Sequence, residues 1–367
     1  MSSDDDSLLS HVSKKDKRWD QHKSENGKIG ALYGANPVYE RYAERMADCA
    51  DWLEFAEVKG EHDRKLKLTR ASFCHVRNCP ICAWRKSLAQ MARLQNNLDM
   101  YLQSNRDLKY IYAVLTVKNC EMSVLRRTIR EMNNATNKLL KRLNRLTKIH
   151  GYVKTVEITK GKDGLPHPHL NLILAVNKSY FTSRDYIAKP KWVTMWRECM
   201  QLDYDPSVFV SKVKPKKKKQ GEAKPGDDLV AGLVEVVKYA VKPSDIEDDA
   251  EFLYGITSQC HKLRFISTGG CLKDIFSDGR RTAEDIDDSD MIRTGTEEED
   301  EKEKISDWRR IYLWYTHRAA YILRQRRQVP QERDQADYEF AHDLTALLRD
   351  RDGIDPPSQS LDGANEQ

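Results

Sequence analysis

Residues 152–176 read YVKTVEITKGKDGLPHPHLNLILAV and predict the centre of the fold. Two runs of mostly apolar and β-branched residues, Tyr152–Thr159 and Pro168–Val176, flank a turn-rich segment that carries Gly161 and Gly164. This pattern predicts an antiparallel β-hairpin. Alternate leucines of the second run then fill the core from one face of the strand, and the residues between them project from the other face.

Two histidines project from that other face, because His167 and His169 are two residues apart. Folding the hairpin about its turn places Thr159 opposite His167 and Glu157 opposite His169, with Glu157 about 5 Å away on the same face. Two imidazoles and one carboxylate leave positions open on a divalent ion for a substrate oxygen. A His-Pro-His by itself is more often a surface turn, so the metal hypothesis depends on the carboxylate and on a second motif.

The second motif is a helix expected over Leu229–Val241. Glu235, Tyr239 and Lys242 follow at spacings of four and three residues, which places them within about 60° on one helix face. A tyrosine hydroxyl can attack a phosphodiester and retain the bond as a phosphotyrosine ester. The carboxylate can activate a water for a second cut, and the lysine can counter phosphate charge. Taken alone, the pattern also fits an ordinary amphipathic helix.

The cysteines suggest a structural metal site. Three of the eight cysteines form a C-x4-C-x2-C cluster: Cys74, Cys79 and Cys82. The C-x2-C part lets two thiolates share one tetrahedral zinc. Cys49 precedes a segment that can return to this cluster as the fourth ligand, and Cys260 with His261 is the competing source. Unliganded core cysteines are the simpler alternative. A zinc nucleobase deaminase is excluded, because its His-x-Glu and Pro-Cys-x-x-Cys motifs are missing.

Composition and charge favour a cytoplasmic protein that binds a polyanion. The 367 residues suffice for two or three domains, and 39% are hydrophobic and 32% charged. Neither a membrane-spanning apolar run nor a signal-peptide pattern is present, so we expect no membrane partner. The net charge is +5, but residues 284–304 hold eleven acidic and three basic residues, which leaves +13 on the remainder. This excess favours a nucleic acid and also fits other basic proteins.

Together, the motifs resemble the replication-initiator (Rep) proteins of rolling-circle plasmids, within the HUH endonuclease superfamily. The resemblance covers roughly residues 45–276. It joins an apolar strand ending Leu115-Thr116-Val117, then Glu157 with His167-Pro168-His169, then Glu235-Val-Val-Lys-Tyr239-Ala-Val-Lys242, which fits a Tyr-x-x-Lys pattern. The run from Cys74 to Arg85 is similar to the class with one catalytic tyrosine and an auxiliary glutamate. Family members often continue His-Pro-His-x-His, whereas Asn171 stands at the last position here.

The resemblance implies a metal-dependent nick at a specific site in one DNA strand. Tyr239 would form a 5′-phosphotyrosine ester, Glu235 would end the cycle by hydrolysis, and Lys242 would assist the chemistry. The metal site of Glu157, His167 and His169 is expected to hold Mg²⁺ or Mn²⁺, which suit the hard oxygens of a phosphate.

The resemblance also implies the partners. It favours Cys49 as the fourth ligand of a structural Zn²⁺. Single-stranded or hairpin origin DNA is the expected substrate, and host helicase and DNA polymerase are the expected protein partners. The expected DNA contacts are Arg77, Arg85 and Arg264, and we expect bases to stack on Trp84 or Tyr180.

The expected fold class is α+β, with an HUH-type central antiparallel sheet flanked by helices, a small zinc-ribbon-like module before it and a helical C-terminal extension. The expected domains are a disordered segment (1–36), the cysteine module with its basic helix (37–105), the HUH nicking-joining domain (106–276), an acidic linker (277–306), a helical region (307–350) and a disordered tail (351–367). Within these, helices are expected over Asn36–Val58, Asp307–Gln328 and Gln331–Asp350.

Two alternatives remain from the sequence. A single-tyrosine HUH transposase is disfavoured by the length of the chain and by the cysteine module. A non-catalytic zinc-ribbon DNA-binding regulator is disfavoured by the intact set of His-x-His, glutamate and tyrosine.

Overall fold

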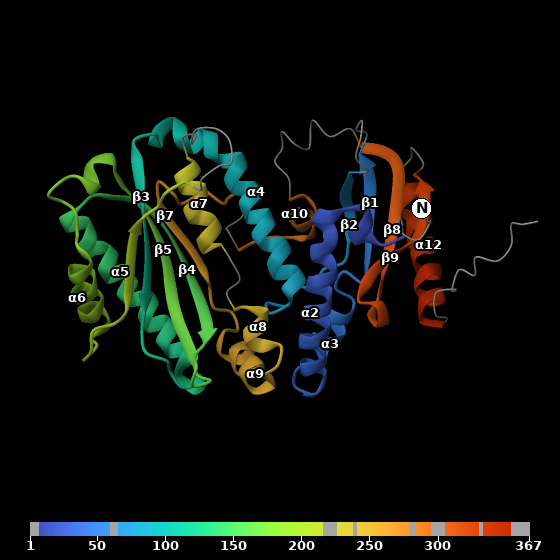
Figure 1. The fold of residues 1–367 in the computed structure, drawn as a ribbon, viewed down its shortest axis with the longest axis horizontal. Helices are drawn as coiled ribbons and strands as arrows, with labels where there is room; N and C mark the ends of the chain where they lie inside the picture. Colours follow the sequence, from blue (N-terminus) through green and yellow to red (C-terminus); the bar gives the residue numbers. More distant parts are fainter. Residues whose placement is uncertain are drawn as a thin grey trace, which may run out of the picture. The chain divides into compact units, whose positions relative to one another are not determined.

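The computed structural model describes residues 7–58, 65–215, 226–237, 241–278, 284–294, 305–329 and 333–353. The chain divides into two compact units, and each contains one antiparallel sheet with helices (Figure 1). The first unit comprises Met1–Gln21, Ala50–Ser72 and Glu303–Gln367, and the second comprises His22–Cys49 and Phe73–Lys302. The predicted α+β class is confirmed. Within the described residues, no helix is both long and apolar enough to cross a membrane.

The second unit is built on a five-stranded sheet in the order β6-β3-β5-β4-β7, antiparallel throughout. Its strands are β3 (Leu108–Thr116), β4 (Ile149–Lys160), β5 (Pro166–Asn177), β6 (Val208–Lys212) and β7 (Ile266–Gly270). β4 and β5 form the predicted hairpin. Their register pairs Thr159 with His167 and Glu157 with His169, which confirms the predicted alignment.

Helices cover both faces of this sheet (Figure 1). The helical elements of this unit include α3 (Glu40–Ala47), α4 (Pro80–Asn105), η2 (Met122–Val124), α5 (Leu125–Leu146), η3 (Lys178–Phe181), α6 (Lys189–Met200), α7 (Asp227–Val236), α8 (Pro243–Ile246), α9 (Ala250–Gln259) and α10 (Asp288–Ile292). α4 and α7 share one core with β4 and β5, in which Leu94 and Leu233 pack with Val153 and Ile173. α5 contacts both strands from the opposite side and packs against α6.

The first unit holds a four-stranded antiparallel sheet in the order β2-β1-β8-β9. Its elements are α1 (Leu9–Val12), η1 (Lys14–Asp16), β1 (Trp52–Val58), β2 (Leu66–Ala71), β8 (Ile305–Tyr315), η4 (Thr316–Arg318), β9 (Ala320–Gln328) and α12 (Arg333–Gly353). Phe340 of α12 packs with Ile311, Leu313 and Ile322 of the sheet. The predicted C-terminal helix is therefore confirmed at α12.

The helix predicted over Asp307–Gln328 is wrong, because β8 and β9 occupy it. Aromatic side chains at Trp308, Tyr312 and Trp314 suit a strand, and β8 pairs with β1, which is remote in sequence. The helix predicted over Asn36–Val58 is only partly right. After α3 the backbone of Ala50 takes a positive φ of 50°, which stops the helix, and β1 follows.

The disorder predicted for residues 1–36 is wrong for the part that the structure describes. α2 (Lys17–Gly34) runs from the first unit into the second. Its apolar side chains Trp19, Ile29 and Tyr33 are buried. Most residues of this helix are polar, and this composition led to the prediction of disorder although three apolar side chains anchor the helix.

Candidate active site

Glu157 and His169 form the centre of the candidate site. Oε2 of Glu157 lies 3.0 Å from Nε2 of His169, and both side chains are largely buried. The amide of Asn171 donates a 3.0 Å hydrogen bond to the same carboxylate oxygen, and the hydroxyl of Tyr112 donates to Oδ1 of Asn171 at 2.9 Å. β3, β4 and β5 therefore hold the carboxylate in one orientation.

His167 lies beside this pair, with 5.8 Å between its ring centroid and that of His169. Burial and the charge of His169 lower the pKa of His167, which favours the neutral imidazole that binds metals. The Nδ1 atoms of both histidines are buried without a hydrogen-bond partner among the described residues. Unpaired buried nitrogens are costly, and together with a carboxylate they are a donor set that fits a divalent ion.

Charges from α7 and from the start of α8 reach this site. Burial, with the negative charges of Glu235 and Glu157, raises the pKa of Tyr112 to about 12. Burial also opposes ionisation of Glu157, but the hydrogen bond and charge of His169 lower its pKa below the ordinary value. The Asn171 amide and the positive charge of Lys242 act in the same direction. Glu235 and Lys242 thus lie within electrostatic reach of the strand residues.

The helix predicted over Leu229–Val241 is shorter in the structure. α7 ends at Val236, and Lys242 is the extended residue that precedes α8, with φ −74° and ψ 140°. Pro243 accounts for the extended backbone of Lys242, because a residue before proline is driven out of the helical region. Lys242 therefore does not share one continuous helix face with Glu235. Tyr239 lies outside the described residues.

The four predicted cysteines form a second candidate site in the same unit. Cys49, Cys74, Cys79 and Cys82 are buried, and their sulfur atoms all lie within 4.8 Å of one another. Cys82 Sγ is 3.6 Å from the Sγ atoms of Cys49 and Cys74. A tetrahedral zinc with Zn–S bonds of about 2.3 Å separates its sulfurs by about 3.8 Å, so the spacing fits a four-thiolate metal site.

Backbone N–H groups support this cluster. Val76 donates to the sulfur of Cys74 at 3.4 Å and Cys82 donates to that of Cys79 at 3.5 Å. Hydrogen bonds from the neighbouring cysteines, first from Cys49, lower the pKa of Cys74. Such contacts favour thiolates and orient metal ligands. Cys260 lies outside the cluster, and burial raises its pKa to about 12, so the competing fourth ligand is excluded.

The predicted DNA contacts differ in accessibility. Arg77 is exposed, donates to the carbonyl of Leu263 at 2.9 Å and lies over the ring of Phe265. Arg264 is exposed near Glu284, at 3.8 Å. The prediction for Arg85 is wrong, because Arg85 is buried and donates to backbone carbonyls at the end of α10, which begins within the predicted acidic linker.

The two aromatic residues expected to stack on bases are also inaccessible. Trp84 is 7% exposed and Tyr180 is 2% exposed. Both side chains belong to the packing of the second unit, so the prediction that they stack on DNA is wrong for this conformation. This burial could not be predicted from the residue types, since a tryptophan or tyrosine suits a core as well as a surface.

Comparison with known proteins identifies the family. The sequence pattern of the family described as "Replication protein" matches residues 65–322. This match spans more than half of the chain, so the protein belongs to the replication protein family. The resemblance to plasmid replication initiators that its motifs suggested is thereby confirmed. No solved structure matches the chain.

Curated relatives agree with this assignment. "Protein rep" of Lactiplantibacillus plantarum is 32% identical over 323 residues, which cover 83% of this chain and 98% of the relative. "Protein rep" of Bacillus amyloliquefaciens is 31% identical over 303 residues, with 78% and 86% covered. A "Replication protein" of Staphylococcus aureus is 27% identical over 228 residues, with 59% and 92% covered. The chain thus spans most of the length of each relative.

Proposed function

We propose that this replication protein starts rolling-circle replication of a plasmid by nicking and rejoining one strand of its origin DNA. The observation that carries the proposal is the pairing of Glu157 with His169 on adjacent strands, with two buried imidazole nitrogens that have no hydrogen-bond partner among the described residues. The names of the relatives favour this role over the transposase alternative.

Glu157, His167 and His169 would hold one Mg²⁺ or Mn²⁺ ion. When bound, the ion supplies a Lewis acid for a phosphate oxygen. The protein's own contribution is to orient the ligands. Asn171 and Tyr112 fix the carboxylate through their hydrogen bonds, and the strand pairing fixes the histidines.

Tyr239 is the proposed nucleophile. Its phenolic oxygen forms a bond to the scissile phosphorus while the bond from phosphorus to the 3′ oxygen breaks. The phenolic proton passes to solvent or to a nearby base, and the leaving oxygen takes up a proton to become a 3′-hydroxyl that primes synthesis. The product is a 5′-phosphotyrosine ester.

Glu235 would act in the hydrolysis that ends the cycle, and Lys242 would act in the first strand cleavage. Glu235 would take a proton from a water that attacks the regenerated site, which ends the cycle without a second tyrosine. Lys242 would stabilise negative charge on the phosphate, since its positive charge already acts on Glu157. A host helicase would then unwind the duplex, and a host DNA polymerase would extend the released 3′ end.

The cysteine cluster would hold one structural Zn²⁺. Arg77 and Arg264 would contact origin DNA in single-stranded or hairpin form. Because a closed four-thiolate site leaves no open position, the zinc would stabilise the fold and take no part in strand transfer.

The test is nicking of a labelled single-stranded origin oligonucleotide with Mn²⁺. The wild-type protein should cut it, His167→Ala should lose the cut, and EDTA should abolish it. The matched control is His150→Ala, a histidine at the start of β4 that pairs with Asn177 at 2.7 Å, away from the site. Cutting that persists undiminished in EDTA contradicts the metal-dependent mechanism.

A further inference from the structure

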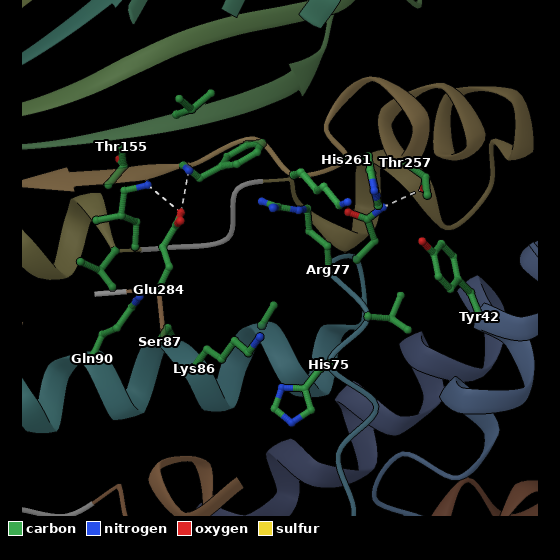
Figure 2. A pocket seen from close by; sticks show the side chains of 18 of the residues that line it. Tyr42, His75, Arg77, Lys86, Ser87, Gln90, Thr155, Thr257, His261 and Glu284 are labelled. Carbon is green, nitrogen blue, oxygen red and sulfur yellow. Dashed lines mark hydrogen bonds between the residues drawn. The ribbon is translucent and has the colours of Figure 1, made fainter. Parts of the chain in front are cut away.

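A cavity of about 510 Å³ lies in the second unit between the loop that joins Cys74 to Cys79, the first turns of α4, the β4–β7 edge and the end of α7. Figure 2 shows Lys86, Ser87 and Gln90 from α4 along one side of it. Thr155 and Glu284 lie at one end, and Tyr42 and Thr257 lie at the other.

The lining is strongly basic. Positively charged or basic side chains come from four segments: Arg45, His75, Arg77, Lys86, His261 and Lys262. Glu284 is the carboxylate among the described lining residues, and its Oε1 already accepts the backbone N–H groups of Phe265 and Ile266 at 2.6 and 2.9 Å. Lys86 and Lys262 have no ion-pair or hydrogen-bond partner in the part of the chain that the structure describes. The cavity therefore suits an anion.

The cavity is lined by residues that are near neighbours in the chain of the candidate active-site residues. Thr155 lines it and lies two residues before Glu157, on the same face of β4. Its hydroxyl is buried without a hydrogen-bond partner among the described residues. Val236 and Val237 also line the cavity and directly follow Glu235. A ligand in the cavity would therefore lie beside the candidate active site.

The cysteine cluster positions the wall of the cavity that the loop between Cys74 and Cys79 forms. The loop between Cys74 and Cys79 supplies His75 and Arg77, and Arg45 donates a hydrogen bond to the carbonyl of Cys74. The amide of Asn78 bonds to the hydroxyls of Tyr33 and Thr257 at 3.0 and 3.1 Å, which fixes the loop to α2 and α9. A metal held by the cysteines would fix this wall as well.

We propose that this cavity binds an unpaired nucleotide of the DNA strand beside the nick, with a backbone phosphate on Lys86 and Lys262. The base would lie against the apolar wall of Val156, Val236 and Phe265. A pocket of this size takes a drug-sized molecule, so a base-paired duplex does not fit. This inference rests on the proposed function, because it places the nucleotide next to the cleavage site.

The test measures binding of a fluorescent single-stranded origin oligonucleotide without divalent metal, so that cleavage plays no part. In Lys86→Ala/Lys262→Ala, the slope of log affinity against log salt should fall by about 0.7 for each lost phosphate contact, and affinity at 0.15 M salt should fall about tenfold. Lys138→Ala/Lys141→Ala is the matched control. It removes the same charge from exposed positions of α5, across the sheet.

A second variant separates the cavity from general electrostatics. Ser87→Trp fills the cavity from α4 without changing charge, and it should weaken single-strand binding while the thermal melt stays near wild type. The proposal is overturned if Lys86→Ala/Lys262→Ala binds like its control, or if the loss is confined to duplex DNA. Failure of wild-type nicking with normal single-strand binding would instead refute the proposed function.

Discussion

The side-chain amide of Asn171 donates a 3.0 Å hydrogen bond to Oε2 of Glu157, the oxygen that also contacts His169. Asn171 stands two residues after His169, where the motif resemblance led us to expect a third histidine. In this chain it fixes the carboxylate, and Tyr112 in turn fixes Asn171. We therefore expect Asn171 to act as a positioning residue for this carboxylate.

Asn171→Ala tests this role. Loss of the amide releases the Glu157 carboxylate, and changes to residues that orient metal ligands typically weaken metal affinity about 10–100-fold. The Mn²⁺ concentration for half-maximal nicking should rise accordingly, with a smaller change in rate at saturating Mn²⁺. Asn177→Ala, at the end of the same strand, is the control. Identical Mn²⁺ dependence in the two variants would show that Asn171 does not position the carboxylate.

Cys79→Ser tests the cysteine cluster. Freshly purified wild-type protein should contain about one zinc per chain by elemental analysis, and the variant should contain less. Because a structural zinc contributes folding free energy, the variant should melt at least about 10 °C lower. Cys199→Ser, a buried cysteine outside the cluster, should retain the zinc. Wild-type protein free of zinc would contradict the assignment.

Glu57 predicts an acid-sensitive first unit. Hydrogen bonds from Arg326 and Arg310 lower its pKa from 4.5 to about 2. A carboxylate with a depressed folded-state pKa contributes stability that is complete above the unfolded value and is lost as pH falls through the folded value. Stability should therefore fall between about pH 4.5 and 2, and Glu57→Gln should flatten this part of the profile. Glu131→Gln, which changes an exposed carboxylate of α5, is the control. An unchanged acid profile in Glu57→Gln would contradict this.

Glu235→Ala should separate initiation from termination. The first nick and the adduct should form at near wild-type rates, because Glu235 does not attack the phosphorus. Hydrolysis of the regenerated site should fail, so displaced strands run on as multimers. Glu235→Tyr should partly restore release by offering a second nucleophile. Release of monomer circles at the wild-type ratio by Glu235→Ala would remove the residue from the mechanism.

The part of the candidate site that lies on one hairpin could be predicted from the sequence, because it depends only on residues that are near one another in the chain. A two-residue strand period and a short turn determine which residues of β4 and β5 face each other, so Glu157 and His169 could be paired without a structure. Asn171 could also have been found, since it is two residues beyond His169 and shares its face. Cys49 was predicted as the fourth ligand from the family resemblance, and its sulfur lies with those of the other three cysteines.

Features that depend on distant partners escaped prediction. β8 is a strand because it pairs with β1, about 250 residues away. The residues of β8 alone do not predict this pairing. The extended backbone of Lys242 was predictable, because Pro243 follows it and a residue before proline is driven out of the helical region. The basic cavity could not be inferred, because its walls come from separate segments that only the fold brings together.

The central claim is that Tyr239 forms the covalent link to DNA, and one measurement tests it most directly. A 3′-labelled single-stranded origin oligonucleotide is incubated with protein and Mn²⁺, and the adduct is isolated on a denaturing gel and mapped by mass spectrometry. We predict a 5′-phosphate ester on Tyr239 in wild type and in the exposed control Tyr186→Phe, and no adduct in Tyr239→Phe. A full yield of adduct from Tyr239→Phe would contradict the account.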